Sequence, residues 1–216
     1  MYNPFMRFRA NILPFLFPYF AVFVGLYLLK NAWIAILLYH AIILVYMIAS
    51  RHLIDFRKAL TGWNSGLFLI SCAISIIAGP ALFVLWNFMK LDFSSLSSKL
   101  AVIRLTNLSW LLFIPYFCLL HPILEELFWR SKSNGASGSE YIKDILFGGY
   151  HILVLVLFIK PEWVIISFFI LAFVSWMWRS ISRKTNGLLI AFLSHILANS
   201  SIIIAVNFIL SQDRVN

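Results

Sequence analysis

The residues of this sequence with the clearest chemical capacity are two neighbouring carboxylates, one arginine and two histidines. Glu125, Glu126 and Arg130 lie at the edge of an apolar run, and two later apolar runs carry His151 and His195. An Asp, Lys or Arg at the centre of a bilayer costs about 3 kcal/mol on insertion scales, so ionisable groups there usually face a bundle interior and serve a function. Carboxylates and imidazoles are common general acids and bases, so the chemistry they could share is proton transfer.

The first motif, residues 125–130, places an acid and a base one helical turn apart. Side chains four residues apart are neighbours on a helix, so Arg130 can pair with Glu126. Glu125 lies about 100° further round the helix and is expected to point elsewhere. The spacing therefore predicts one carboxylate that is held ionised and one that is left free to titrate. A salt bridge at the membrane edge, capping the helix end, is the alternative explanation.

The second motif, residues 147–151, combines an aromatic ring, two glycines and a histidine. Phe147 lies one helical turn before His151 and can pack against it. Gly148 and Gly149 permit close approach of a neighbouring helix, as small residues do at membrane helix interfaces. The motif therefore predicts that His151 lies near another helix. A histidine whose hydrogen bond goes to a backbone carbonyl in a tightly packed helix is the alternative.

The third motif places His195 and Asn199 on one face of the last apolar helix. Both side chains can donate hydrogen bonds. Polar contacts between helices are the alternative, since such bonds stabilise membrane bundles by roughly 0.6 to 2 kcal/mol. The other three histidines show no such pattern and are interpreted as structural or interfacial: His40, His52 and His121.

Taken in order, the motifs read Glu-Glu-x-x-x-Arg, Phe-x-x-x-His and His-x-x-x-Asn on successive apolar helices. This ordered set, within about residues 105–205, resembles the CAAX prenyl protease and bacteriocin-processing (CPBP or Abi) family of glutamate-type intramembrane proteases. The resemblance implies that Glu125 and His151 activate water. It implies an oxyanion hole formed by His195 and Asn199. The catalytic candidates and their structural supports are Glu125, Glu126, His151, His195 and Asn199, with Arg130 and Phe147.

Peptide hydrolysis is consistent with the physics of such a site. Burial favours the neutral form of a carboxyl group, which makes its carboxylate a stronger proton acceptor. Preorganised donors at the developing oxyanion contribute roughly 3 to 4 kcal/mol each in comparable sites. Zinc bound by Glu125, His151 and His195 is a conceivable alternative, because these side chain types bind zinc. The resemblance implies a reaction without metal or other cofactor, and the sequence contains no His-Glu-x-x-His motif.

The elements that must position these residues follow from composition. The 216 residues are 62% apolar and 12% charged, with 21 Phe and 8 Trp, and the mean hydropathy is +0.92. That leaves too little polar surface for a soluble domain and predicts an all-α, polytopic membrane bundle in one domain, residues 1–216. Since about 20 helical residues span a bilayer, we expect about seven helices, within a range of six to eight. They are expected near residues 10–29, 32–50, 65–88, 105–123, 144–160, 163–178 and 187–210, the fifth and sixth being short.

The net charge of +9 could suggest nucleic acid as a partner, but the 17 basic residues are scattered between apolar runs. With the N-terminus in the cytoplasm, eleven of them fall in inside segments and six in outside segments. This bias predicts a multi-pass protein of the bacterial cytoplasmic membrane, N-terminus inside and C-terminus outside, that does not bind nucleic acid. Cys72 and Cys118 lie in apolar helices and are interpreted as buried thiols.

The sequence thus favours an intramembrane endopeptidase that acts on a lipid-modified or membrane-embedded tail or leader. A non-catalytic immunity or scaffold protein that keeps the polar cluster for packing is one alternative. A proton-coupled transporter is another, because buried carboxylates and histidines also form proton relays. A serine mechanism is a weaker alternative: Ser137 lies in a Gly-x-Ser-Gly sequence that resembles the nucleophile of rhomboid proteases, but polar residues follow it.

Overall fold

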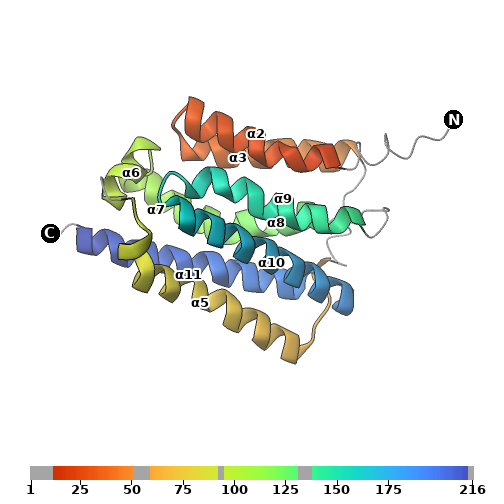
Figure 1. Cartoon of the computed structure of the whole chain (residues 1–216). Helices are drawn as coiled ribbons and strands as arrows, with labels where there is room; N and C mark the ends of the chain where they lie inside the picture. The colour runs from red at the N-terminus through yellow and green to blue at the C-terminus, as the bar shows by residue number, and fades with distance from the viewer. Residues whose placement is uncertain (1–11, 51–58, 92–94, 131–137, 214–216) are drawn as a thin grey trace.

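The structure is a computed structural model that describes residues 12–50, 59–91, 95–130 and 138–213. The regular elements among these residues are helices, which form one bundle with the two termini at opposite ends (Figure 1). Their bounds are η1 Leu13–Leu16, α2 Phe17–Val22, η2 Phe23–Leu28, α3 Ala32–Ala49, α5 Ser65–Met89, α6 Leu96–Val102, α7 Asn107–Pro115, η3 Tyr116–Leu120, α8 His121–Trp129, α9 Gly138–Leu155, α10 Pro161–Thr185 and α11 Leu189–Asp213. The predicted all-α membrane bundle is confirmed.

Two of the long segments are composites of shorter helical pieces. Elements η1, α2 and η2 follow one another without a break, as do α7, η3 and α8, and the residues at their junctions keep helical backbone angles. Counting each composite once, the described residues contain seven long helical segments. Five of these are long and apolar enough to cross a membrane. Leu13–Leu28 is shorter, and α9 carries three charged residues in its first two turns.

The boundaries of three predicted helices are wrong, because ionised residues continue a helix when they have partners inside the bundle. The fourth helix continues past residue 123 to Trp129. The fifth begins earlier, at Gly138, and ends at Leu155. The sixth is not short: α10 has 25 residues and ends at Thr185, and its last turns carry Arg179 and Arg183, which pair with acids of α9.

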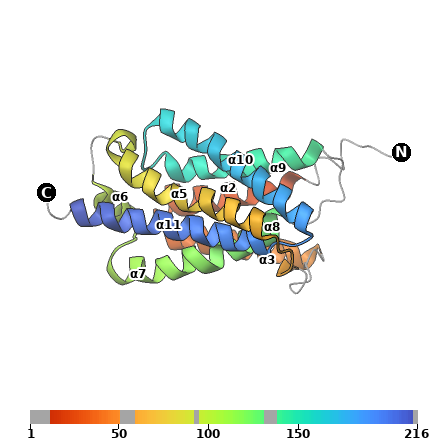
Figure 2. The same ribbon diagram turned by 90° about the horizontal axis from the view of Figure 1, so that it is seen from below.

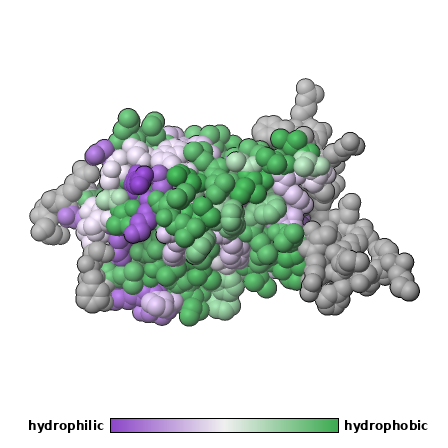
Figure 3. Space-filling model, turned by 90° about the horizontal axis from the view of Figure 1, so that it is seen from above, coloured by the Kyte–Doolittle hydropathy of each residue, from purple (hydrophilic) through white to green (hydrophobic). Residues whose placement is uncertain are grey.

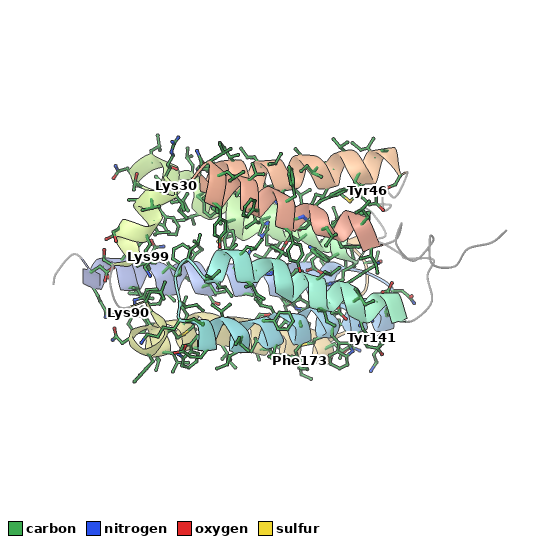
Figure 4. The ribbon with its side chains drawn as sticks, turned by 45° about the horizontal axis from the view of Figure 1, so that its top comes forward. Lys30, Tyr46, Lys90, Lys99, Tyr141 and Phe173 are labelled. Carbon is green, nitrogen blue, oxygen red and sulfur yellow. The ribbon has the colours of Figure 1, made fainter. Side chains whose placement is uncertain are left out.

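Apolar side chains cover much of the outer surface of the bundle (Figure 3). Val84, Leu69 and Phe169 are 70%, 66% and 65% exposed. Because a lipid-facing surface has no need of polar groups, this exposure is expected of helices that cross a bilayer. The lysines Lys30, Lys90 and Lys99 lie toward one end of the bundle and Tyr141 toward the other (Figure 4).

Helix α8 lies at the centre of the bundle and brings the first motif inside. Its buried residues include Glu125, Glu126, Phe128 and Trp129. Side chains from α3, α9, α10 and α11 form hydrogen bonds or ion pairs with α8 and its C-cap. The helix is therefore surrounded by the other elements that carry polar residues.

Helices α5 and α11 lie side by side in both ribbon views (Figures 1 and 2). They approach each other closely at Gly79, whose backbone N–H donates to Ser201 Oγ at 3.2 Å. A Cβ atom at Gly79 would lie 2.1 Å from the carbonyl oxygen of Ser201. The absence of a side chain at Gly79 therefore sets the distance between the two helices.

We expect Gly79→Ala to destabilise the protein by about 1 to 3 kcal/mol, because the helices must separate to admit a methyl group. Gly66→Ala on the same helix is the matched control, since the nearest atom to its Cβ would lie 3.5 Å away. Thermal unfolding of both purified variants in detergent measures the difference. Equal melting temperatures would contradict the packing described for α5 and α11.

Candidate active site

Glu125 is fully enclosed, with an exposed fraction of 0%. Its Oε1 atom accepts hydrogen bonds from Tyr39 Oη at 2.9 Å and from Tyr150 Oη. Its Oε2 atom lies 3.4 Å from His121 Nε2 and 3.6 Å from His195 Nε2. Groups on three other helices therefore contact this carboxylate, and its freedom to titrate stays a prediction.

Glu126 is also 0% exposed and forms the predicted pair with Arg130. Arg130 Nε lies 3.1 Å from Glu126 Oε2. The other oxygen, Oε1, lies 3.0 Å from His195 Nδ1. One imidazole thus lies between the two carboxylates, and Glu125 does not point away from Glu126 as predicted. Two side chains 100° apart on α8 can contact the same ring because α11 packs against the face between them.

His195 is held in its position by aromatic packing as well. The indole ring of Trp178 on α10 stacks on it, with ring centroids 4.5 Å apart and an angle of 27°. Both residues are buried, with exposed fractions of 4% and 2%. Because the stacked indole fixes the plane of the imidazole, its two nitrogens are directed at the two carboxylates.

His151 reaches the cluster through the ring of Tyr150. Its ring lies 4.8 Å from that of Phe147, which confirms the predicted contact. His151 Nδ1 lies 2.7 Å from the Phe147 carbonyl oxygen, so this nitrogen donates and Nε2 is the acceptor in the neutral ring. The rings of Tyr150 and His151 are 4.0 Å apart, and Tyr150 Oη donates to Glu125 Oε1. His151, which the family resemblance pairs with Glu125, is therefore linked to this carboxylate through Tyr150.

Asn199 lies one turn beyond His195 on α11 and contacts a different element. Its Nδ2 atom donates to the Phe117 carbonyl oxygen at 3.0 Å. Phe117 belongs to the π-helix η3, and such segments shift the regular backbone pattern, often at functional sites. Of the predicted residues, the structure brings Glu125, Glu126, His195 and Arg130 together through the contacts described above. Asn199 instead has a hydrogen bond to the backbone of η3.

Sequence reasoning missed four further polar residues of the cluster. Tyr39 and Tyr150 contact Glu125 from α3 and α9. His121 precedes Glu125 by one helical turn, so the spacing rule used for Arg130 predicts this contact too. His40 Nε2 lies 3.0 Å from His121 Nδ1. The interpretation of His40 and His121 as residues without nearby partners is wrong.

The buried polar contacts continue toward the end of the bundle where α9 begins. Arg130 Nη1 donates to Ser175 Oγ at 3.0 Å, and Ser175 Oγ donates to Asp144 Oδ1 at 2.9 Å. Arg179 pairs with Asp144 through Nε and Nη2. These contacts join α8, α9 and α10 and hold Arg130 where it can face Glu126.

The remaining predictions concern the two cysteines, His52, Ser137 and a bound metal. Cys72 and Cys118 are buried free thiols, as predicted. His52 and Ser137 lie outside the described residues. Within the described ranges, no group of three or more His, Cys, Asp or Glu side chains is placed to hold a metal ion.

Comparisons with protein-family models, with curated proteins and with solved structures find no match to this chain. The residues of the site define a closed cluster of two carboxylates, several imidazoles and two phenols at the centre of a membrane helix bundle.

We expect Arg130→Met to destabilise the protein by about 3 to 5 kcal/mol, because it leaves the Glu126 carboxylate buried without its partner. The Arg130 side chain is 2% exposed. Arg183→Met is the matched control: it removes an ion pair with Glu140 whose arginine is 58% exposed, and exposed pairs contribute about 0 to 1 kcal/mol. Chemical unfolding in mixed detergent measures both. A small loss in the Arg130 variant would show that Glu126 does not depend on this pair.

Proposed function

We propose that this protein is an intramembrane endopeptidase in which Glu125 activates a water molecule for attack on a peptide bond. One observation carries the proposal: Glu125 is fully buried, and its Oε2 atom forms no hydrogen bond within the described residues. A general base must offer a free lone pair within reach of the proton that it accepts. The two tyrosine bonds to Oε1 fix the carboxylate and leave Oε2 for that role.

His151 supports the same proposal through its tautomer. Because its Nδ1 atom donates to the Phe147 carbonyl, Nε2 carries the lone pair in the neutral ring. Such a nitrogen can accept a hydrogen from the attacking water and orient it. The Tyr150 ring, between His151 and Glu125, keeps the imidazole and the carboxylate in a fixed relation.

Stabilisation of the oxyanion is proposed for His195 and Asn199. One hydrogen of Asn199 Nδ2 is used by the Phe117 carbonyl, and the second can be donated to a substrate. In this closed arrangement His195 Nδ1 lies 3.0 Å from Glu126 Oε1 and Nε2 lies 3.6 Å from Glu125 Oε2, so substrate entry has to turn the His195 ring or displace a contact. Glu126 and Arg130 would keep α8 in place during that change.

The position of the site indicates the class of substrate. The cluster lies among apolar helices, five of which are long and apolar enough to cross a membrane. A peptide that reaches Glu125 must enter this apolar environment, so we propose a membrane-embedded or lipid-modified tail or leader as substrate. We also propose the bacterial cytoplasmic membrane, with the N-terminus inside, and no role for nucleic acid.

A non-catalytic membrane scaffold is the second candidate, and the Asn199 contact favours it. A carboxamide that bonds a backbone carbonyl on a neighbouring helix stabilises the bundle without any chemistry. His195, with each ring nitrogen close to a carboxylate, fits the same description. The two candidates differ in whether substitution of these residues affects turnover or only stability.

We predict that Glu125→Gln lowers cleavage by a factor of about 100 to 10 000, because it removes the proton acceptor and keeps the shape. The assay is cleavage of a pool of membrane-spanning and lipid-modified peptides in proteoliposomes. Ser137→Ala is the control and should leave cleavage unchanged. If instead the serine variant is inactive and the glutamine variant is active, a serine mechanism replaces the one proposed.

Persistence of cleavage in strong chelator would exclude the zinc alternative.

We predict that Asn199→Ala lowers stability by about 1 kcal/mol, since it removes one hydrogen bond between helices. An oxyanion role requires in addition a fall in single-turnover cleavage by a factor on the order of 100, with substrate binding nearly unchanged. Both quantities are measured on the same purified variant. Loss of stability with normal turnover would remove Asn199 from the catalytic residues.

A further inference from the structure

Four titratable side chains form a row that begins at Glu125 and continues through His121 and His40 to Tyr116. The row ends between α3 and η3. His121 Nε2 faces Glu125 Oε2 at 3.4 Å. His121 Nδ1 lies 3.0 Å from His40 Nε2, and His40 Nδ1 lies 2.6 Å from Tyr116 Oη. The proposed reaction uses none of these three residues, yet each ring nitrogen in the row faces the next titratable group.

Hydrogen-bond chemistry restricts how hydrogens can be arranged along this row. Two ring nitrogens in one hydrogen bond share a single hydrogen, so His40 and His121 cannot both be doubly protonated. With Glu125 ionised and both imidazoles neutral, Tyr116 donates to His40 Nδ1, and His40 Nε2 donates to His121 Nδ1. His121 Nε2 then directs its hydrogen toward Oε2, which it does not yet bond at 3.4 Å, so every hydrogen in the row points toward the carboxylate.

The same row has one other consistent arrangement, in which every bond is reversed. If Glu125 carries a proton, Oε2 donates to His121 Nε2, His121 Nδ1 donates to His40 Nε2, and His40 Nδ1 donates to Tyr116 Oη. The Tyr116 hydroxyl hydrogen then points out of the row. The two arrangements differ by one hydrogen moved one step across each contact, which is how a relay passes a proton.

A row of this kind matters for Glu125 because other helices enclose this carboxylate. Glu125 is 0% exposed, and the groups in contact with it from other helices are Tyr39 of α3, Tyr150 of α9 and His195 of α11. Tyr39, Tyr150 and His195 are themselves 2%, 3% and 4% exposed. Tyr116, at the far end of the row, is only half-buried. The row therefore links an enclosed carboxylate to a less enclosed hydroxyl.

We propose that His121, His40 and Tyr116 form a proton relay between Glu125 and a water molecule that enters the bundle beside the Tyr116 hydroxyl. When Glu125 loses its proton, Oε2 passes it to His121 Nε2, His121 Nδ1 passes its hydrogen to His40 Nε2, and His40 Nδ1 passes its own to Tyr116 Oη. The phenol then releases its hydroxyl hydrogen to a water molecule. Uptake reverses each step. The 3.4 Å contact has to shorten for transfer, as such contacts often do during reaction.

The first test needs no variant and no substrate, so it stands apart from the peptidase proposal. In the full-length protein in lipid nanodiscs, ¹⁵N spectra of the histidine rings report which nitrogen carries the hydrogen. The relay requires His40 and His121 to be the same tautomer, with a scalar coupling between His40 Nε2 and His121 Nδ1. Opposite tautomers, or the absence of this coupling, would overturn the proposal.

The second test follows proton arrival at Glu125 by time-resolved infrared spectroscopy after a pH jump. The carboxylic C=O band of Glu125 is the one that Glu125→Gln removes. Tyr116→Phe and His40→Gln should slow its appearance by about a hundredfold, the low end of what a positioned proton-transfer group contributes. The control is Tyr27→Phe, which removes a tyrosine hydrogen bond to the Leu153 carbonyl outside the row. Unchanged rates in the two test variants, or a Glu125 band that never responds to pH, would overturn the relay.

Discussion

The burial of two neighbouring carboxylates on α8 is the constraint on which the arrangement of the bundle depends. Glu125 and Glu126 are both 0% exposed, and a buried ion without partners costs several kcal/mol. Three other helices supply partners for these carboxylates: Tyr39 from α3, Tyr150 from α9 and His195 from α11. Helix α8 can occupy the centre of the bundle only when these three helices present their polar groups together.

The contacts that stabilise α8 are also the contacts that would shape its chemistry. The tyrosine bonds hold one oxygen of Glu125 and leave the other without a hydrogen bond in the described structure. His195 bridges the two carboxylates, and the stacked Trp178 fixes its plane. In the proposed reaction, a substrate carbonyl would have to compete with these contacts to reach Glu125. Part of its binding free energy would then be used to open the cluster.

Local spacing predicted the contacts made within a helix and failed for those made between helices. The pair Arg130 with Glu126 and the packing of Phe147 on His151 both follow from a separation of four residues. The same rule would have predicted the contact between His121 and Glu125. It could not predict the contact of Tyr39, because this residue lies 86 residues from Glu125 along the chain and no local spacing links the two. The predicted helix ends were wrong where charged residues pair with other residues inside the bundle, as Arg179 pairs with Asp144.

The most direct test of the central claim is the fate of solvent oxygen during cleavage. The purified protein in nanodiscs is incubated in H₂¹⁸O with a pool of membrane-embedded peptides, and both products and intact protein are weighed by mass spectrometry. Attack by water activated at Glu125 predicts new C-terminal carboxyls that carry one ¹⁸O atom, with no change in the mass of the protein. An acyl adduct on the protein, or the absence of any new peptide termini, would contradict the account.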